Sequence, residues 1–497
     1  MSLLEALRDA VGTDHVLVDP DLRAAYETDW TGAFHGSALA VVRPASTTEV
    51  ASVVRACARY RTPVQVQGGN TGLVGGSVPS GGEVLLSTTR LAGIEEVDSL
   101  TAQVTVGAGV TLSALRHHVA RAGHDLGVDL AARDSATVGG MAATNAGGVQ
   151  VIRHGSMRTQ VIGLEAVLAD GSVVSRLGSL AKDNAGYDLA SLLCGSEGTL
   201  GVITRVRMRL VPRLAARAVA VVALADVGAA VAALPALRAR LPHLSAAEVF
   251  FAEGLSLVRA TGHLPALFRV EHPCYLLLEC AGLEEDVDDL FEALVEVLDA
   301  LEGLQDAVVA TDAAGRRRLW AYREGHTEAV AAAGVPVKLD VSVPVRELPA
   351  LVDRLAPAVS DACPGARVVV FGHLGEGNLH VNVLGADHVR AEVTHAVLAA
   401  VADLGGSISS EHGVGRAKAA WLGLSRSPTE IAAMRAIRAA WDPAGLLNPG
   451  VLFAGRNADG GDDRTVNRQA RPTAPEASAR TVETSPPSSH RRIRHAC

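Results

Sequence analysis

Two glycine-rich segments constrain the fold of this chain more than any other feature: GGNTGLVGG at 68–76 and GGMAATNAGG at 139–148. Each borders a strand-like run of apolar residues. Dense glycines permit positive φ and let backbone N–H groups approach an anion closely. Either segment alone is equally compatible with a tight turn. Together with a third glycine turn, SEGTLGVI at 196–203, they indicate a large phosphate-bearing cofactor.

These segments do not follow the common nucleotide-binding patterns. Neither is followed by the Gly-Lys-Ser/Thr of a P-loop, and neither places GxGxxG between a strand and a helix. The cofactor is therefore expected to bind outside the Rossmann fold.

The chain has 497 residues, too many for one compact core, and its patterns predict an α+β protein in four parts. These parts are a helical segment at 1–36, an α+β unit at 37–212, a second α+β domain at 213–454 and a tail at 455–497. The tail is rich in Arg, Ser, Pro and Thr and is expected to be disordered. Within the second domain, the patterns predict a hairpin at 366–384 and helices at 389–404 and 428–441.

The overall composition excludes several classes of protein. A net charge of −9 argues against a nucleic-acid or anionic-membrane surface. The most apolar stretch, at 218–235, contains Asp226 and predicts a strand followed by a helix rather than a membrane span. The N-terminus lacks the layout of a signal peptide, and the six cysteines show no CxxC spacing. We therefore expect a cytoplasmic protein with reduced thiols.

The segment GHLGEGNLHVN at 372–382 places His373 and His380 seven positions apart around a glycine-rich turn. A hairpin with a two-residue loop at 376–377 would set the two histidines directly opposite each other. Opposed side chains have Cβ atoms about 5 Å apart, which lets two imidazoles bind one cation. Asn382 lies two residues beyond His380 and shares its face.

A third ligand is needed, and SEHGVG at 410–415 supplies Glu411 and His412 beside a glycine turn. Two histidines and one carboxylate leave coordination positions open for a substrate, as in catalytic metal sites. Each of these residues alone is more simply a polar loop residue. The set of residues, however, predicts a metal site.

Lysine usage points to further site residues. Of the 45 Lys and Arg residues, three are lysines, at positions 182, 338 and 418. In VPVKLDVSVP at 335–344, alternation places Lys338, Asp340 and Ser342 on one strand face. A lysine on so apolar a strand suggests a buried anionic partner.

A candidate arginine lies in WAYREGHTEAV at 320–330, which predicts a helix. Arg323 and Thr327 are four residues apart and would share a face of that helix. A surface arginine is the simpler interpretation of Arg323 taken alone.

Seven segments in this order carry a resemblance to a known family: VQGGNTGLVGGSVP, ATVGGMAATNAGG, KDNAGYDL, GSEGTLGVIT, GHLGEGNLH, SEHGVGRAK and DPAGLLNPG. Across residues 66–450 the chain resembles an FAD-dependent 2-hydroxyacid dehydrogenase of the vanillyl-alcohol-oxidase (PCMH-type) flavoprotein superfamily. The resemblance implies a two-subdomain FAD-binding domain at 37–212, followed by a substrate and metal domain with C-terminal helices.

The resemblance also implies which residues contact FAD. The pyrophosphate would lie between the glycine-rich segments, against Gly68, Gly69, Asn70, Thr71, Gly72, Ser135, Gly139 and Gly140. The flavin or adenine side would be lined by Asn145, Gly148, Ile203 and Asn448. Some relatives attach FAD covalently through a histidine in the first loop. This chain has Asn70 and no histidine there, so non-covalent binding is expected.

The same resemblance implies that His373, His380 and Glu411 bind a divalent metal, usually zinc, with iron or manganese left open. His412 would be the general base or would hydrogen-bond the substrate, beside Asn382. The pattern R-x-x-x-T followed by K-x-D, at Arg323, Thr327 and Lys338, resembles the branch that oxidises D-2-hydroxyglutarate. The two cationic side chains, Arg323 and Lys338, suggest a substrate with a second carboxylate, hence a dicarboxylic acid.

Several alternatives stay open at this point. D-lactate, glycolate or D-malate is an alternative substrate for the same fold. A non-oxidising flavin transferase or a catalytically silent flavoprotein subunit is an alternative of another class. The expected electron acceptor is an electron-transfer flavoprotein or a quinone, and a homodimer is possible on this evidence.

Overall fold

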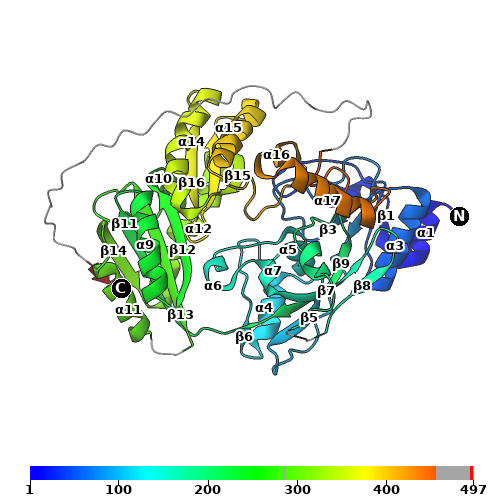
Figure 1. The fold of residues 1–497 in the computed structure, drawn as a ribbon, viewed down its shortest axis with the longest axis horizontal. Coiled ribbons are helices and arrows are strands. Elements are labelled where there is room, and N and C mark those ends of the chain that lie inside the picture. Colours follow the sequence, from blue (N-terminus) through cyan, green and yellow to red (C-terminus); the bar gives the residue numbers. More distant parts are fainter. Residues whose placement is uncertain (179, 181, 284–286, 455–492, 496–497) are drawn as a thin grey trace.

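The computed structural model describes residues 1–497 except 179, 181, 284–286, 455–492 and 496–497. Figure 1 shows two bodies side by side, one blue to cyan and the other green to yellow, with the orange C-terminal helices over the first. Both contain helices and sheets, as the sequence predicts.

The first body begins with a four-stranded sheet in the order β1-β2-β4-β3, in which β2 and β3 run parallel to β4. Helix α3 starts at its cap Ser46, whose hydroxyl accepts the N–H of Glu49 at 3.2 Å. The elements are α1 (Leu3–Val11), η1 (Thr13–His15), β1 (Val16–Leu17), α2 (Pro20–Glu27), β2 (Ala40–Val42), α3 (Thr47–Tyr60), β3 (Val64–Gln67) and β4 (Val84–Ser87).

A second four-stranded sheet, in the order β5-β9-β7-β8, is antiparallel and shares one hydrophobic core with the first sheet. The sheet strands are β5 (Gln103–Gly107), β7 (Val161–Val167), β8 (Val173–Ser175) and β9 (Val202–Arg209). The short pair is β6 (His124–Asp125) with β10 (Val211–Pro212). The helices are α4 (Leu112–Ala120), α5 (Val138–Thr144), α6 (Val151–His154), α7 (Met157–Gln160) and α8 (Leu189–Leu193).

The second body is built on an eight-stranded sheet in the order β15-β17-β16-β12-β13-β11-β14-β18. Every neighbouring pair in it is antiparallel except β14 with β18. Its strands are β11 (Ala216–Leu224), β12 (Leu244–Phe251), β13 (Cys274–Gly282), β14 (Leu304–Ala310), β15 (Val337–Ser342), β16 (Arg367–His373), β17 (Asn378–Leu384) and β18 (Ile493–His495). Of the predicted tail, only β18 is described, and the expected disorder of the remaining residues lies outside the described part of the chain.

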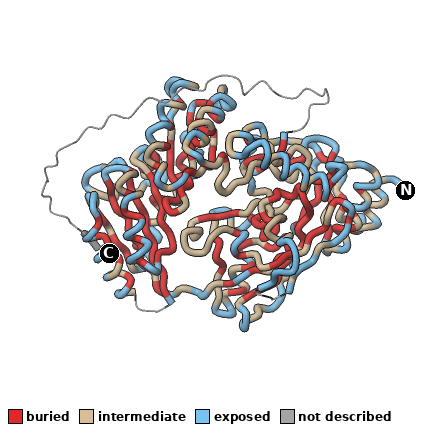
Figure 2. Tube along the Cα trace, in the orientation of Figure 1, coloured by how far each residue is buried: buried red, intermediate tan, exposed pale blue. Residues whose placement is uncertain are grey.

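Helices cover both faces of this sheet, and Figure 2 shows its strands as a buried layer. Alternate residues of β11 explain why: Ala218, Ala220 and Val222 pack in the larger core, and Val219 and Val221 pack in the core on the other face. The larger core contains residues of α9 (Val227–Arg240), α11 (Asp288–Asp299), α14 (Leu348–Ala362) and α15 (Arg390–Asp403). The other contains residues of α10 (Ala252–Gly262) and α12 (Ala313–Glu324), with α13 (His326–Ala333) beside α10.

The N-terminal segment and the segment around Leu446 both pack into the first body. Leu7 and Val11 of the N-terminal segment belong to its core, and so do Leu446 and Leu447. The backbone N–H of Val64 in β3 donates to the carbonyl of Leu446 at 2.8 Å. The helical elements not yet given are η2 (Val345–Glu347), η3 (Asp387–Val389), η4 (Ala419–Trp421), α16 (Leu422–Ser425) and α17 (Pro428–Trp441). The C-terminal segment therefore returns from the second body to the first.

Among the described residues, no helix combines the length and apolar character that crossing a membrane requires. The strand and helix predicted at 218–235 are β11 and α9. Five cysteines are free and buried, and Cys497 lies outside the described residues.

Candidate active site

The two histidines of the hairpin converge, but through a different register from the predicted one. His373 pairs with Asn378, and Phe371 pairs with His380, so the turn comprises the four residues 374–377 rather than two. The difference in register is two residues, and because side chains alternate with a period of two, the histidines keep a common face. Their ring centroids lie 5.3 Å apart at an interplanar angle of 84°. The imidazoles therefore meet diagonally, not directly across the strands.

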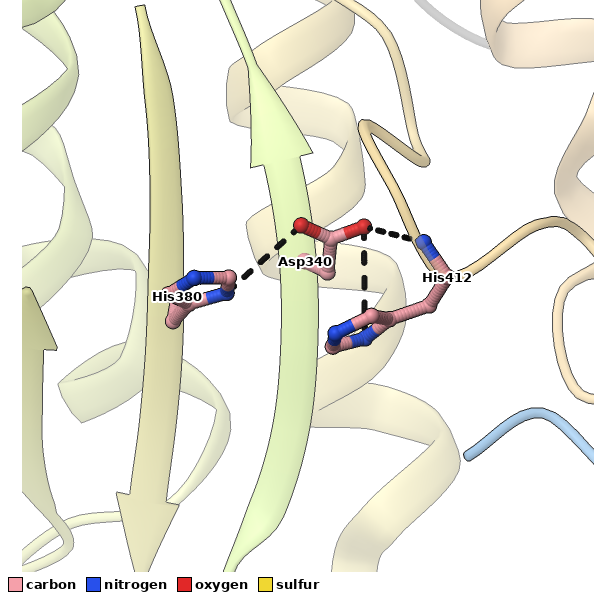
Figure 3. Close-up of side chains that lie close together, drawn as sticks. All are labelled: Asp340, His380 and His412. Atoms are coloured by element: carbon pink, nitrogen blue, oxygen red, sulfur yellow. Dashed lines mark hydrogen bonds and ion pairs between the residues drawn. The ribbon is translucent and has the colours of Figure 1, made fainter. Parts of the chain in front are cut away.

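The loop that carries Glu411 and His412 is held by a carboxylate on β15. Asp340 Oδ2 accepts the backbone N–H groups of Ser410, Glu411 and His412 at 3.0, 2.7 and 3.0 Å. Its Oδ1 accepts Nδ2 of Asn378 at 2.9 Å. Figure 3 shows Asp340 between the rings of His380 and His412. One buried strand residue thus positions the loop against the hairpin.

Among the described residues, two groups of side chains could hold a metal ion, and they share His380. One is His373, His380 and Glu411, and the other is Asp340, His380 and His412; in each, the candidate ligand atoms lie within 4.8 Å of one another. The Asp340 carboxylate already accepts four hydrogen bonds. Glu411 is freer, because Oε1 accepts the N–H of Gly148 at 2.6 Å while Oε2 lies 3.6 Å from Nε2 of His373. The first group, which the sequence predicts, is the better metal site.

Burial and neighbouring charges shift the pKa values of these groups in different directions. Burial lowers the pKa of His380 to about 3, so its imidazole is neutral and has a lone pair for a cation. Burial opposes charge on His373 too, but the carboxylates of Glu248 and Glu411 outweigh it and raise its pKa. Burial would raise the pKa of Glu411, yet the neighbouring His373 lowers it to about 2. The site therefore supplies an ionised carboxylate next to a neutral imidazole.

Glu248 is a site residue that the sequence reasoning missed. It lies in β12 and is paired with His373 on the neighbouring strand β16, and its side chain is 1% exposed. Its carboxylate accepts the Nδ1–H of His373 at 2.7 Å and pairs with Arg323 at 2.7 Å. The sequence does contain a signal that could have identified Glu248. It is the single acidic residue of the apolar run LSAAEVFF, and this run contains no basic residue that could neutralise it.

Arg323 and Thr327 do not share one continuous helix as predicted. Helix α12 ends at Glu324 and α13 begins at His326, with Gly325 between them. Arg323 is buried, with its guanidinium 4.7 Å from the ring centroid of Phe371, whereas Thr327 is exposed. The structure thus brings Arg323 into the hairpin site through Glu248 and leaves Thr327 on the surface.

Lys338 and Asn382 are paired across β15 and β17. Asn382 is buried, and Lys338 is half-buried, which lowers the pKa of its ammonium. The Lys338 Nζ lies 5.4 Å from the ring centroid of Trp30, an exposed residue of the N-terminal segment. Trp30 is a second neighbour of the site that the sequence reasoning did not identify.

Lys418 accounts for another of the three lysines. It is buried, and its Nζ donates to the backbone carbonyl of Asp340 at 3.0 Å. The third, Lys182, is exposed. Two of the three lysines therefore lie in or under the site.

The first glycine-rich segment packs closely against residues 135–140, where the second glycine-rich segment begins. A Cβ on Gly68 would overlap the hydroxyl of Thr137, and one on Gly69 would overlap the carbonyl oxygen of Ser135. A Cβ on Gly139 would collide with Ala108. A Cβ on Gly72, by contrast, would meet nothing within 4 Å. Two loops this close, with open space beside Gly72, fit a phosphate-bearing cofactor held by backbone N–H groups.

The first of these segments is shaped by Asn70, which has a φ of 54°. Its side chain donates to the carbonyl of Thr28 at 2.7 Å and accepts the hydroxyl of Ser77 at 2.8 Å. Thr71 follows it and is half-buried. In the second segment, the Thr137 hydroxyl caps α5 by accepting the N–H of Gly140 at 3.3 Å.

The other predicted cofactor residues differ in their surroundings. Asn145 ends α5 with a φ of 53°, and its Oδ1 accepts hydrogen bonds from Ser156 and Arg158. Ile203 is buried in the core of the first body. Asn448 accepts the N–H of Val66 at 2.8 Å. Its amide therefore holds the C-terminal segment on β3.

Glu197, in the third glycine turn, connects the two bodies and was not predicted. Its side chain is buried and accepts the N–H groups of Val414 and Gly415 at 2.8 and 2.7 Å. Its own carbonyl accepts Nδ2 of Asn448 at 2.7 Å. The loop at 410–415 is thus held from one side by Asp340 and from the other by Glu197.

A cavity of about 150 Å³ joins the predicted cofactor and metal residues. It is lined by Asn145 and Gly147 from the first body and by His373, Glu376 and Glu411 from the second. Burial raises the pKa of Glu376 to about 7. A substrate in this region would contact both bodies.

Comparisons with known proteins identify both bodies. Residues 38–176 match the FAD binding domain, and residues 213–452 match the C-terminal domain of FAD linked oxidases. The mitochondrial D-2-hydroxyglutarate dehydrogenase of Bos taurus is 39% identical over 89% of this chain and 82% of its own length. The D-2-hydroxyglutarate dehydrogenase of Xanthomonas citri pv. viticola is 38% identical over 91% of this chain and 97% of its own.

Solved structures share the fold at low identity. p-Cresol methylhydroxylase has a TM-score of 0.72 at 17% identity, covering 91% of this chain and 96% of its own. Alkyldihydroxyacetonephosphate synthase has a TM-score of 0.68 at 17% identity, covering 90% of this chain and 84% of its own. The cofactor expected from the glycine-rich segments is FAD, on the evidence of the matched domains. The chain belongs to the D-2-hydroxyglutarate dehydrogenase family of FAD-linked oxidases.

Proposed function

We propose that this enzyme oxidises a D-2-hydroxy acid to the 2-oxo acid, with D-2-hydroxyglutarate as the preferred substrate and 2-oxoglutarate as the product. The observation that carries the proposal is the grouping of His373, His380 and Glu411, of which His373 and Glu411 line a cavity that the FAD-binding body also lines. The names of the two relatives, each similar over most of its length, support the substrate.

A divalent metal ion, preferably zinc, is part of this proposal. The three ligand atoms are close enough to share one ion, and two histidines with a carboxylate suit zinc. His380 is neutral, as a ligand must be, whereas the raised pKa of His373 means that this imidazole would release a proton when a metal binds. A metal bound here would lower the pKa of the substrate's 2-hydroxyl.

His412 is proposed as the general base that takes the proton of the 2-hydroxyl. Its ring lies 5.7 Å from that of His380 and almost parallel to it, so the base lies next to the metal ligands. Its Nδ1 is 3.9 Å from Asp340 Oδ2. That carboxylate would stabilise the positive charge that the imidazole gains. The FAD isoalloxazine, bound non-covalently, supplies the acceptor for the hydride from C2.

Arg323 and Lys338 are proposed to bind the distal carboxylate of a dicarboxylic substrate, with Asn382 as a further contact. Arg323 shares the carboxylate of Glu248, and Lys338 faces Trp30, so both cations are held on the hairpin side of the site. D-lactate or glycolate lacks the second carboxylate, and so it would gain little from these residues. D-malate remains a competing dicarboxylic substrate.

The route of the electrons and the location of the enzyme are proposals too. An electron-transfer flavoprotein or a quinone is the proposed acceptor. The proposed location is the cytoplasm, and the proposed assembly is a homodimer. The free and buried cysteines are compatible with a reducing compartment.

Steady-state kinetics with a dye acceptor test the proposal. The FAD-loaded enzyme is stripped of metal with a chelator and assayed with D-2-hydroxyglutarate, D-malate, D-lactate and glycolate, before and after Zn²⁺ is returned. We expect activity to depend on the added metal and kcat/KM to be highest for D-2-hydroxyglutarate. Full activity without metal would contradict the metal role, and a higher kcat/KM for D-lactate would contradict the substrate assignment.

A further inference from the structure

Glu248 lies under the active site without a role in the proposed chemistry. It is the central charged residue of β12, with Leu277 opposite on β13 and His373 opposite on β16. Its side chain is 1% exposed, so water cannot solvate the carboxylate. Ionised carboxylates at such depth are stable only with partners of opposite charge or hydrogen-bond donors. One oxygen of Glu248 accepts a hydrogen bond, and the other pairs with a cation.

The first oxygen orients His373. Glu248 Oε1 and Nδ1 of His373 lie 2.7 Å apart, and because a carboxylate only accepts, Nδ1 carries the hydrogen. The other ring nitrogen, Nε2, is thereby directed toward Glu411, whose Oε2 is 3.6 Å away. Histidine ligands commonly donate their second N–H to a carboxylate in this way, which fixes the ring and strengthens the ligand.

The second oxygen restrains Arg323. Glu248 Oε2 lies 2.7 Å from the guanidinium, whose other contact is the ring of Phe371 at 4.7 Å. The Nε of Arg323 is buried and makes no hydrogen bond among the described residues. The guanidinium is thus placed by Glu248 on one side and by an aromatic face on the other, with a donor still available.

We infer that Glu248 is a positioning residue that couples metal binding to recognition of the distal substrate carboxylate. One rigid carboxylate in the middle of the sheet sets the direction of His373 and the place of Arg323. Moving it would disturb both. This inference rests on the proposed function and extends it to a residue that touches neither substrate nor metal.

A purely structural role is the competing explanation, and the chain offers a matched control. Glu279 lies on the neighbouring strand β13 and is 9% exposed in its side chain. It pairs with Arg217 at 2.7 Å and accepts Nε1 of Trp320 at 2.9 Å. The hydroxyl of Ser245 also donates to it at 3.2 Å. Its burial and its arginine partner resemble those of Glu248, but none of its three partners belongs to the predicted site. Loss of either carboxylate should cost similar stability.

The experiment compares Glu248→Gln with Glu279→Gln in the full FAD-loaded chain. Zn²⁺ affinity is measured on metal-stripped protein by competition with a chromophoric chelator, which needs no turnover. For Glu248→Gln we expect zinc affinity to fall about 10- to 100-fold, the usual cost of losing such a partner. The kcat/KM ratio of D-2-hydroxyglutarate to D-lactate should fall about tenfold, the size of one lost charge-assisted hydrogen bond. Glu279→Gln should change neither.

Glu248→Asp covers the case in which Glu248→Gln does not fold. It keeps the charge but shortens the side chain, so zinc affinity should fall while FAD absorbance and the melting temperature show a folded enzyme. Unchanged zinc affinity in Glu248→Gln, or in a folded Glu248→Asp when the first variant fails, overturns the inference and leaves the proposed function intact. Equal losses in Glu279→Gln would also overturn it. A wild-type enzyme that binds no zinc contradicts the proposed function and this inference together.

Discussion

The Asp340 carboxylate accepts the backbone N–H of Glu411 at 2.7 Å, although the two residues are 71 positions apart. Asp340 is fully buried, and burial alone would raise its pKa. The neighbouring His412 ring and the Lys418 ammonium outweigh burial and lower the pKa, so the carboxylate is ionised. An ionised acceptor at this point determines where the loop carrying Glu411 can lie.

Asp340→Asn should therefore weaken metal binding. An asparagine keeps the shape of the side chain, but it presents one oxygen acceptor where the carboxylate uses two. We expect zinc affinity to fall about 10- to 100-fold, as for other residues that orient metal ligands. The measurement is chelator competition on the FAD-loaded, metal-stripped protein.

Asp442→Asn is the control for that variant. Asp442 is also buried, and its carboxylate accepts the N–H groups of Leu446 and Leu447 at 2.8 Å each. Its loss should lower the melting temperature and leave zinc affinity within about twofold, below the usual effect of a residue that orients a ligand. Equal zinc affinities in the two variants would show that Asp340 does not position the ligand loop.

Arg323→Ala should impair dicarboxylic substrates more than D-lactate. The guanidinium is the buried cation that we propose for the distal carboxylate, so kcat/KM for D-2-hydroxyglutarate should fall at least about tenfold more than for D-lactate. The variant also leaves Glu248 without its cation, which should cost about 3–5 kcal/mol of unfolding free energy. Kinetics and denaturant unfolding measure the two effects.

Arg217→Ala separates the two effects, because it removes the arginine partner of another buried carboxylate, Glu279. It should lower stability without changing the ratio of the two substrates. If both variants change the kcat/KM ratio of the two substrates equally, the effect of Arg323 comes from the stability of the sheet and not from contact with the substrate.

Trp30→Ala should raise KM for D-2-hydroxyglutarate with little change in kcat. The segment that carries Trp30 is anchored to the first glycine-rich loop, since Asn70 donates to the carbonyl of Thr28 at 2.7 Å. From there Trp30 places its ring 5.4 Å from the ammonium of Lys338. An exposed cation–π contact contributes about 0.5–1 kcal/mol, so KM should rise about two- to fivefold.

Trp30→Phe keeps an aromatic face and should recover most of the affinity. The difference in emission between wild type and this variant reports Trp30 itself, and substrate should change it. Identical KM values for all three proteins, with no change in emission, would exclude Trp30 from the substrate site.

His326 makes the stability of the protein sensitive to acid. Its ring is 1% exposed, its Nε2 makes no hydrogen bond among the described residues, and burial lowers its pKa from 6.5 to about 3. Between these two values the unfolded chain binds a proton that the folded chain does not. The unfolding free energy therefore falls as pH drops from 6.5 toward 3, by up to about 1.4 kcal/mol per pH unit from this residue.

His326→Gln should make this pH dependence shallower by up to that amount, as measured by urea unfolding between pH 6.5 and 4. The exposed His388 is the control, and His388→Gln should leave the slope unchanged. A variant at His326 with the wild-type slope would assign the acid sensitivity to other groups.

The difference in hairpin register shows which features of the site a local sequence pattern can predict and which it cannot. Alternation predicts correctly that His373 and His380 share a face, because an even shift in pairing preserves the face. It does not determine the length of the turn. In the structure Gly377 has a φ of 70°, and a Cβ there would overlap the backbone oxygen of Val343, so the turn packs on the segment after β15. That contact, remote in sequence, is absent from any local pattern.

Local sequence patterns are enough to predict two glycine-rich loops, two histidines on one face, and Glu411 with His412 in a turn. These features depend on turn propensity and strand alternation, which act over a few residues. Which carboxylates hold them in place depends on contacts between distant parts of the chain. Glu248 meets His373 across 125 positions and Glu197 meets Val414 across 217, because strand order in the sheet and the return of the C-terminal segment bring them together. A buried acid in an apolar strand needs partners, and the fold alone determines which residues those are.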